Sequence, residues 1–373
     1  MREGWTYKKL GEVCNIRTGK LNANAMVEDG EYPFFTCDSN PYRIDKYAFD
    51  TEAILISGNG SLVGHVNYYK GKFNAYQRTY VLDNFSHFHI PYLLTFLKGY
   101  LRPYIKRNFK GGCIPYITLP ILQSFSIPLP PKSQQEAIVS ELDEINSLFA
   151  LKREQLQKYD KLAQSLFYEM FGDPVENEKG WEVKKLGEIC HKITDGSHFS
   201  PSGHPDGIYP MLSVKDMKGH SFSYEDCKYI NEEDYAILLK QGCKPLLNDV
   251  LVAKDGSYFK TAFVIKDERE QAILSSIAIL RPDLKIVEPI YLQEMLLQKS
   301  IKDSVDRFYV TGTAIKRVIL KKLGTLITIL PPLSLQQQFA SRIEQIESQK
   351  QQVQAAIEKL ETLLASRMQY WFE

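Results

Sequence analysis

Two long stretches of this chain place their apolar residues at alternating steps of four and three, with polar residues between them. Adding 201 to a position in the first stretch gives its counterpart in the second. Three of the spaced positions are charged and not apolar: Lys152, Lys350 and Arg367. The spaced positions are Ile138, Leu142, Ile145, Phe149, Lys152, Leu156, Tyr159, Ala163, Leu166 and Met170, then Phe339, Ile343, Ile346, Lys350, Val353, Ile357, Leu360, Leu364, Arg367 and Trp371. This spacing predicts two long helices of the coiled-coil type.

Helix-start signals precede both stretches. Each follows a proline pair, Pro130-Pro131 or Pro331-Pro332, and Ser133 and Ser334 are the expected N-caps. The first stretch ends at Gly172-Asp173-Pro174. Roughly 38 helical residues span about 57 Å. Because one helix cannot bury its own narrow apolar seam, we expect the two helices to pair, although two amphipathic helices on separate cores are an alternative.

The segments before the helices share their edges but not their middles. Trp5–Cys14 recurs as Trp181–Cys190, an offset of 176, whereas the ends follow the offset of 201, so the second segment is 25 residues longer. Short strands and turns are expected in each middle, with turns at Gly58–Ser61 and Gly71. The strands are predicted at 53–57, 63–69, 79–82, 250–253, 262–265 and 275–280, and amphipathic helices follow at 91–101 and 289–302.

Composition fits a soluble protein of about two domains, since 44% of the 373 residues are hydrophobic and 24% are charged. No apolar run is long enough to cross a bilayer, and the six cysteines show no metal-ligand spacing, so we expect reduced thiols in the cytoplasm. Basic charge is concentrated outside the helices: residues 1–130 carry 15 basic and 10 acidic side chains, whereas residues 131–179 carry 6 and 10. This mildly favours globular parts that contact phosphates.

Catalytic motifs are present only as fragments. Asn40-Pro41-Tyr42 lacks the second proline of an adenine-methyltransferase motif, and Gly58–Gly64 has the wrong spacing for a dinucleotide loop. Pro205-Asp206 with Asp226-Cys227-Lys228 fits only a degenerate nuclease pattern. No histidine pair has metal-ligand spacing on a helix, so we expect neither catalysis nor a metal site in this chain.

The order of these features resembles the specificity subunit of type I restriction–modification systems. The resemblance rests on the openings Trp5–Glu12 and Trp181–Glu188, on Ile127–Pro131 and its later copy, on Gln134–Glu136 and on Thr194–His198. It covers essentially the whole chain. It implies an α+β fold in which two target-recognition domains (1–130 and 173–330) are separated by two long helices (131–172 and 331–373) that form an antiparallel coiled coil.

The resemblance also implies a function. Each domain would read one half of a bipartite double-stranded DNA target, and the coiled coil would set the gap and dock two methyltransferase subunits, which restriction subunits then join. S-adenosylmethionine, ATP and Mg²⁺ would belong to those partners. In antiparallel pairing Ile138 would face Trp371, Lys152 would face Ile357 and Lys350 would face Tyr159. Half-sites roughly 34–36 Å apart lie within reach of such helices, so four inserted residues would add about 6 Å, or one or two base pairs.

Candidate DNA contacts are polar or basic residues on loops. In the first segment they are Lys20, Asn22, Asn24, Arg43, Asn59, Ser61, Tyr76, Gln77, Arg78, Lys106, Arg107 and Lys110. In the second they are Ser197, His198, Lys215, Lys254, Ser257, Tyr258, Lys260, Arg307, Tyr309, Thr311 and Thr313. Asp195-Gly196 is expected to be a turn that positions its neighbours. The alternative function is a coiled-coil scaffold with two partner-binding modules and no role on DNA.

Overall fold

The computed structural model describes residues 4–108, 116–312 and 316–372. The chain forms two compact units: unit 1 comprises Met1–Arg153 with Ala355–Glu373, and unit 2 comprises Glu154–Gln354. The two long helices, α4 (Lys132–Phe171) and α10 (Leu333–Phe372), each contribute to both units. The four-part division made from the sequence stays a prediction.

The starts of the two long helices differ from the prediction. Because α4 begins at Lys132 and α10 at Leu333, Ser133 and Ser334 lie in the first helical turn and not at the N-cap. Pro131 takes the cap position, since its carbonyl accepts hydrogen bonds from the backbone N–H of Gln134 and Gln135. A proline suits this place because it has no N–H to lose.

A buried glutamine in each long helix explains another match between the two copies. The Gln135 side chain donates to the carbonyl of Pro130 (3.0 Å) and accepts from the N–H of His89 (2.8 Å). Gln336 repeats this with the carbonyl of Pro331 (2.7 Å) and the N–H of Glu288 (2.9 Å). Each glutamine therefore ties the start of its helix to the globular part before it.

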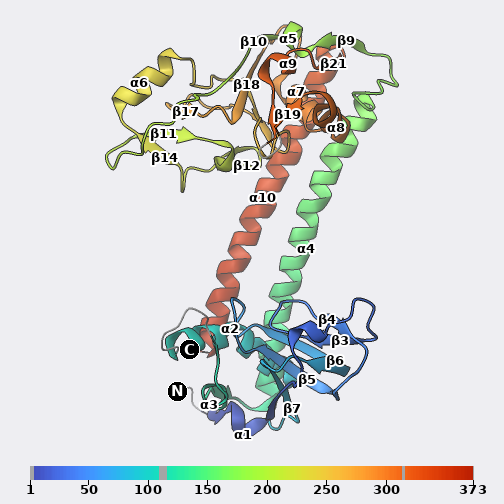
Figure 1. Cartoon of the computed structure of the whole chain (residues 1–373), viewed down its shortest axis with the longest axis vertical. Coiled ribbons are helices and arrows are strands. Elements are labelled where there is room, and N and C mark those ends of the chain that lie inside the picture. Colours follow the sequence, from blue (N-terminus) through green and yellow to red (C-terminus); the bar gives the residue numbers. More distant parts are fainter. Residues whose placement is uncertain (1–3, 109–115, 313–315, 373) are drawn as a thin grey trace. The chain divides into compact units, whose positions relative to one another are not determined.

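Unit 1 is built on a six-stranded mixed sheet in the order β2-β7-β5-β6-β3-β4 (Figure 1). All neighbours are antiparallel except β3 and β6. The strands are β2 (Asn15–Thr18), β3 (Tyr32–Phe35), β4 (Tyr42–Ile44), β5 (Phe49–Ser57), β6 (Val66–Ala75) and β7 (Thr79–Asp83). The predicted turn at Gly71 is wrong: β6 runs through Gly71, which pairs with Thr51, because the nine-residue β5 supplies partners along its whole length.

The longest helix before α4 packs on this sheet. Helix α2 (Ile90–Asn108) is longer than the predicted 91–101 and buries Leu93, Leu97 and Leu101 against Ile54 and Leu82. The shorter elements are β1 (Thr6–Lys9), α1 (Leu10–Val13), the 3-10 turn η1 (Ala23–Ala25), α3 (Leu119–Gln123) and β8 (Ser126–Leu129). Strands β1 and β8 pair antiparallel, which joins the tryptophan-containing opening to the segment before α4.

Unit 2 repeats this plan with more pieces. Its four-stranded sheet has the order β10-β18-β15-β16, and a three-stranded sheet has the order β14-β11-β17. The strands are β9 (Glu182–Lys185), β10 (Cys190–Asp195), β11 (Tyr209–Leu212), β12 (Met217–Lys218), β13 (Ser221–Phe222), β14 (Lys228–Ile230), β15 (Val250–Ala253), β16 (Ala262–Val264), β17 (Ala272–Ile273), β18 (Ile277–Pro282), β19 (Val310–Thr311), β20 (Arg317–Val318) and β21 (Ile327–Leu330).

The helices of unit 2 correct one prediction. The single helix expected at 289–302 is two, α7 and α8, which are separated at Leu297 and Gln298. The remaining elements are α5 (Leu186–Ile189), η2 (Val214–Asp216), α6 (Glu232–Lys240), α7 (Pro289–Leu296), α8 (Lys299–Phe308) and α9 (Leu320–Leu323). Helix α6 and the hairpin of β12 and β13 lie in the middle of the second segment, which is longer than that of the first.

Within each unit, one end of α4 packs against the opposite end of α10. In unit 1, Ile138 and Leu142 share a cluster with Leu364, Met368 and Trp371. In unit 2, the ring of Phe339 lies 5.6 Å from Phe167 and 5.2 Å from Phe171. The helices are therefore antiparallel, as the resemblance implied, and Ile138 and Trp371 lie in one cluster as expected.

Candidate functional site

In unit 1, four backbone segments meet at one end of the sheet. The N–H of Gly19, after β2, donates to the carbonyl of Thr79 (3.4 Å), and the N–H of Gly58, after β5, donates to that of Arg78 (2.8 Å). The carbonyl of Gly58 accepts from Ile117 (2.8 Å), beside an antiparallel bridge between Asn59 and Tyr116. We call this arrangement the loop frame of unit 1.

Unit 2 contains the same loop frame. The N–H of Gly196 donates to the carbonyl of Ile277 (3.3 Å), and that of Lys254 donates to Ser276 (2.8 Å). The carbonyl of Lys254 accepts from Val318 (3.1 Å), beside an antiparallel bridge between Asp255 and Arg317. Ile117 and Val318 differ by 201, as do Tyr116 and Arg317. The divergent middles of the two segments thus converge on one backbone arrangement.

A glycine is required where each loop frame begins. A Cβ at Gly19 would lie 1.8 Å from the carbonyl oxygen of Ala75, and one at Gly196 would lie 2.1 Å from that of Ile273. No side chain fits at such a distance. This explains Thr18-Gly19 and Asp195-Gly196. The turn predicted at Asp195-Gly196 is wrong, because Asp195 ends strand β10 and pairs with Ala278, and Ser197 after the glycine bridges to Leu274.

The frame of unit 1 gathers most of the residues predicted there. Tyr76, Gln77 and Arg78 form its turn, and the Gln77 amide donates to Asn22 Oδ1 (2.7 Å). Asn59 and Ser61 follow β5, and Lys20 follows Gly19. Beside the turn lies a cavity of about 270 Å³ lined by Thr18, Gly58, Gln77, Arg78, Tyr80 and Ile117. Arg78, Gln77 and Lys20 are exposed, so this end of the sheet presents donors and positive charge to solvent.

The frame of unit 2 is charged and partly closed on itself. The buried Lys254 ammonium pairs with Asp195 (3.3 Å) and with Asp255 (3.4 Å). At the rim, His198 Nε2 lies 3.3 Å from Asp195, and Arg317 Nε lies 3.7 Å from Asp255. The His198 and Arg317 side chains are 79% and 62% exposed. Contacts thus run from the buried lysine through two carboxylates to the exposed imidazole of His198 and the exposed guanidinium of Arg317.

Three of the residues predicted in unit 2 are buried and bonded or packed within the protein. Lys254 is paired as described, Tyr258 lies in the hydrophobic core, and the Ser197 hydroxyl bonds to the carbonyl of Phe199 (2.7 Å). All three are buried. Because a buried side chain does not reach a ligand at the surface, these residues organise the frame. His198, Lys215, Ser257 and Lys260 are exposed beside it, and contact with DNA stays a prediction for them.

Most of the other predicted residues lie apart from the frames. Arg43 is on the edge strand β4, where its Nε donates to the carbonyl of Gly30 (2.9 Å), and Asn24 is in η1. Lys106 and Arg107 lie in the last turn of α2. Arg307 and Tyr309 lie at the end of α8, whereas Thr311 in β19 is next to the frame of unit 2 because it pairs with Arg317. Lys110 and Thr313 lie outside the described residues.

The prediction missed Tyr116, Ser275, Ser276 and Arg317, which the frames place beside the predicted residues. The offset of 201 maps Tyr116 onto Arg317, and this signal was present in the sequence. The turn of unit 2 gave no such signal, because Leu274–Ile277 does not resemble Tyr76–Thr79.

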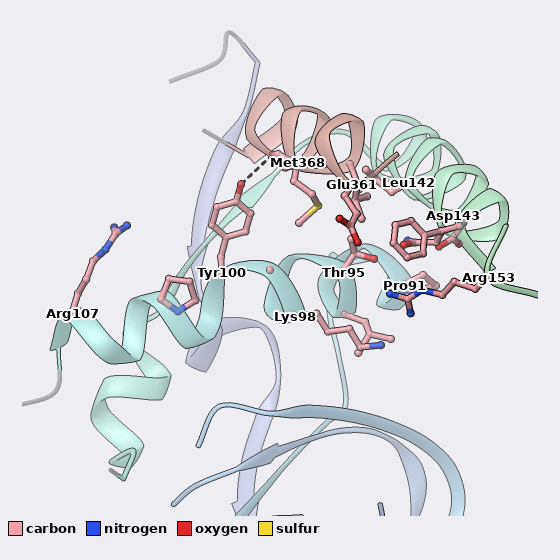
Figure 2. A pocket seen from close by; sticks show the side chains of 17 residues that line it. Pro91, Thr95, Lys98, Tyr100, Arg107, Leu142, Asp143, Arg153, Glu361 and Met368 are labelled. Atoms are coloured by element: carbon pink, nitrogen blue, oxygen red, sulfur yellow. Dashed lines mark hydrogen bonds between the residues drawn. The ribbon is translucent and has the colours of Figure 1, made fainter. Parts of the chain in front are cut away.

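A second candidate site in unit 1 is a groove of about 970 Å³ between α2, α4 and α10 (Figure 2). Leu142, Phe149, Leu364 and Met368 contribute apolar surface. Its charged lining residues are Lys98, Arg107, Asp143, Arg153 and Glu361. The Tyr100 hydroxyl donates to the carbonyl of Met368 (3.1 Å), and the Arg153 guanidinium lies 4.4 Å from the Phe149 ring centre. A groove of this kind suits an amphipathic segment.

In unit 2 the chain's own side chains fill the counterpart of this groove. The offset of 201 relates Asn146, Phe149 and Glu361 of the groove to Glu347, Lys350 and Asp160. Lys350 Nζ lies 2.9 Å from both Asp160 and Glu347, and His220 of the β12–β13 hairpin lies 3.5 Å from Glu347. Burial alone would lower the pKa of Lys350, but hydrogen bonds to the two carboxylates raise it.

That network extends to a buried acid. Glu294 is 8% exposed and accepts a hydrogen bond from Gln293 (2.7 Å), which also contacts His220 Nδ1 (3.1 Å). Burial raises the pKa of Glu294. Lys350 was expected to face Tyr159 across the helix pair; it reaches the next residue, Asp160, so this lysine is paired rather than simply extended to solvent.

Within the described ranges, no group of His, Cys, Asp and Glu has the arrangement of a metal site. None of the described helices combines the length and apolar character that a bilayer crossing needs. Cys14, Cys37, Cys190, Cys227 and Cys243 are free thiols. Burial, and secondarily Asp83, raises the pKa of Cys14 to about 12, so this thiol is a poor nucleophile at neutral pH.

The comparison with protein families accounts for nearly the whole chain. The model of the type I restriction modification DNA specificity domain matches residues 2–159 and again residues 178–362. The two matches follow the internal repeat. This chain belongs to the type I restriction–modification DNA specificity family. The resemblance inferred from the sequence is confirmed.

Individual relatives agree with this assignment. The specificity subunit of the type I restriction enzyme EcoDI from Escherichia coli is 53% identical over 79 residues, which are 21% of this chain and 17% of that protein. The MjaIX specificity subunit from Methanocaldococcus jannaschii is 27% identical over 244 residues, 60% of this chain and 54% of that protein. The aligned part of this chain thus spans about half of one relative and less of the other.

Solved structures confirm the fold. The S subunit of a type I restriction–modification system from M. genitalium has a TM-score of 0.58 at 16% identity, over 99% of this chain and 96% of that one. A chain from a study of complex assembly and conformational transition of the type I R-M system has a TM-score of 0.63 at 17% identity, over 99% and 97%. The predicted α+β fold with two globular parts and paired long helices is therefore confirmed.

Proposed function

We propose that this chain is the DNA-reading subunit of a type I restriction–modification complex, and that each loop frame reads one half of a bipartite duplex target. The observation that carries the proposal is that two equal backbone frames present different side chains: the exposed Arg78 and Tyr116 in unit 1, and the half-buried Ser276 with the exposed Arg317 in unit 2. Equal frames would dock on equal DNA grooves, and unlike side chains would select unlike sequences.

The chain itself performs no chemistry in this proposal. S-adenosylmethionine, ATP and Mg²⁺ belong to the partner subunits: two methyltransferase subunits and the ATP-dependent restriction subunits, all in the cytoplasm. The groove of unit 1 and the exposed leucines of the long helices, Leu148, Leu151, Leu162 and Leu363, are the surfaces offered to the methyltransferases. Exposed apolar positions on otherwise polar helices support such docking.

The test is a methylation map of cells that express the chain with its cognate methyltransferase. We expect N6-methyladenine in a split motif with a fixed gap. Arg78→Ala should relax recognition in one half-site and leave the other unchanged, whereas Lys132→Ala, an exposed change at the start of α4, should leave the motif as it is. Equal weakening on all sequences would make Arg78 a phosphate contact.

A coiled-coil scaffold without a DNA role is the alternative. A scaffold would not bind duplex DNA in a salt-dependent way, because it would make no phosphate contacts and would release no counterions. A gel-shift titration of the assembled complex at two salt concentrations separates the two functions. The family assignment favours the DNA-reading subunit.

A further inference from the structure

Arg317 occupies a fixed position in the loop frame of unit 2. Its strand β20 pairs with β19 (Thr311 opposite Arg317), and its backbone also bridges to Asp255. The next residue, Val318, donates its N–H to the carbonyl of Lys254 (3.1 Å). The backbone at Arg317 is therefore held from two sides, which a surface loop would not provide.

The Arg317 side chain also lies beside a carboxylate. Its Nε lies 3.7 Å from Asp255 Oδ2, while the other oxygen of that carboxylate lies 3.4 Å from the buried Lys254 ammonium. Lys254 is 9% exposed at the side chain and pairs in addition with Asp195 (3.3 Å). One oxygen of Asp255 is paired with the buried Lys254, and its other oxygen lies beside the Nε side of the Arg317 guanidinium, so the carboxylate attracts that side while most of the side chain stays exposed.

The guanidinium can recognise one particular base. Two parallel N–H donors match the O6 and N7 acceptors of guanine in the major groove, and this bidentate contact is the commonest specific contact between arginine and DNA. The Arg317 side chain is 62% exposed and can therefore reach a base, and the neighbouring Asp255 carboxylate favours positions of the guanidinium close to it.

The pair of Arg317 and Asp255 occurs in the loop frame of unit 2 and has no equivalent in the loop frame of unit 1. The same bridge there joins Asn59 to Tyr116, and Gly58 stands where unit 2 has Lys254. Neither the carboxylate nor its buried lysine has a counterpart at these positions. The exposed arginine of unit 1, Arg78, stands on the turn, where unit 2 has Ser276.

We infer that Arg317, oriented by Asp255, reads a guanine in the half-site contacted by unit 2. This inference rests on the proposed function and adds a residue, a base and a positioning group to it. Asp255 acts through Arg317, and Lys254 through Asp255.

The experiment measures base preference with the complete complex of this chain and its methyltransferase, by selection from duplexes with randomised half-sites. In the wild type, one position of the half-site read by unit 2 should be a guanine on one strand. Arg317→Lys keeps the charge but loses the two-pronged edge, so preference at that position should fall about 5- to 100-fold. The other half-site and the dependence of binding on salt should stay unchanged.

Two further variants separate positioning from contact and from folding. Asp255→Asn should lower preference at the same single position by less than Arg317→Ala does, because the arginine remains but is no longer held. Arg342→Ala, an exposed change on α10, should alter nothing. If Arg317→Lys leaves every base preference intact, or if Arg317→Ala weakens all sequences equally and reduces the salt slope, the guanine assignment is wrong.

Failure of the inference is distinguishable from failure of the proposed function. A wild-type complex that selects a bipartite motif while Arg317→Lys selects the same motif overturns only the Arg317 assignment. A wild-type complex that selects no motif overturns both.

Discussion

Glu141 joins the two long helices of unit 1 through its carboxylate. It pairs with Arg367, whose Nη2 lies 3.0 Å away, and accepts a hydrogen bond from the Trp371 indole (2.8 Å). The hydrogen bond from Arg367 is the main cause that holds the pKa of Glu141 below its ordinary value of 4.5. The ionised form therefore stabilises the folded state at neutral pH.

Replacing Glu141 by Gln should lower the stability of unit 1 by about 1 kcal/mol at pH 7, since the pair is only partly buried. Because the folded pKa is depressed, the contribution is complete above the ordinary pKa and is lost as pH falls through the lowered value. Thermal unfolding at pH 7, 4 and 3 should show the full deficit of Glu141→Gln at pH 7, and the wild type should converge on the variant only below the ordinary pKa of 4.5. Glu144→Gln, an exposed change on the same helix, is the control, and an equal deficit at every pH would contradict the assignment.

The exposure of single residues was predictable where a local turn sets it, and not where a distant partner buries the side chain. Gln77 and Arg78 follow from a polar turn between two apolar runs. The sequence marks Lys254 as a basic loop residue in the same way, yet its carboxylate partner Asp195 comes from a strand far upstream. No local pattern encodes that pairing, so the sequence could not predict that Lys254 is buried and paired.

Helices and strands were predictable where an apolar repeat continues over the whole element. The long helices follow from an apolar repeat that continues over their whole length, and their pairing follows from the duplicated register. Strand β6 and helices α7 and α8 were misjudged at their ends, because pairing with β5 carries β6 through Gly71 and the backbone of Gln298 is extended between the two helices. Pairing with a distant strand sets the end of β6, and local propensity does not encode it.

The groove between α2, α4 and α10 should matter to one methyltransferase subunit more than to the other, because its counterpart in unit 2 is filled by Lys350 and its partners. Replacing Phe149 and Arg153 together by Ala removes an aromatic ring and the cation stacked on it. We expect affinity for one methyltransferase copy to fall about tenfold or more, as for other aromatic contacts at interfaces.

Native mass spectrometry of the complex, titrated with methyltransferase, measures this directly. The variant should pass through a 1:1 species where the wild type goes to 2:1. Lys359→Ala, an exposed change on α10 of unit 1 that does not line the groove, is the matched control. Two equal affinities in the Phe149 and Arg153 variant would show that the groove is not a methyltransferase seat.

The whole molecule repeats one plan while varying its surface. Both units contain a glutamine, Gln135 or Gln336, that is hydrogen-bonded to the segment before its helix. Both also contain a short helix, α1 or α5, and a loop frame. The sequence revealed this repeat at the edges, where residues match. It could not reveal the frames, because there the backbone is shared and the side chains differ.

Because α4 and α10 each contribute to both units, their length should set the gap between the two half-sites. Seven residues inserted after Arg153 and seven more after Gln354, positions related by 201, keep the apolar seam in phase because its steps repeat every seven residues. The insertion adds about 10 Å of helix, or about three base pairs.

The methylation map of this double insertion should show both half-sites unchanged and a gap about three base pairs longer. An insertion in α4 alone shifts its register against α10, so it should lower stability and abolish methylation. If the double insertion instead methylates sites with the original gap, the long helices do not measure the target, and the spacing must come from the DNA or from the partner subunits.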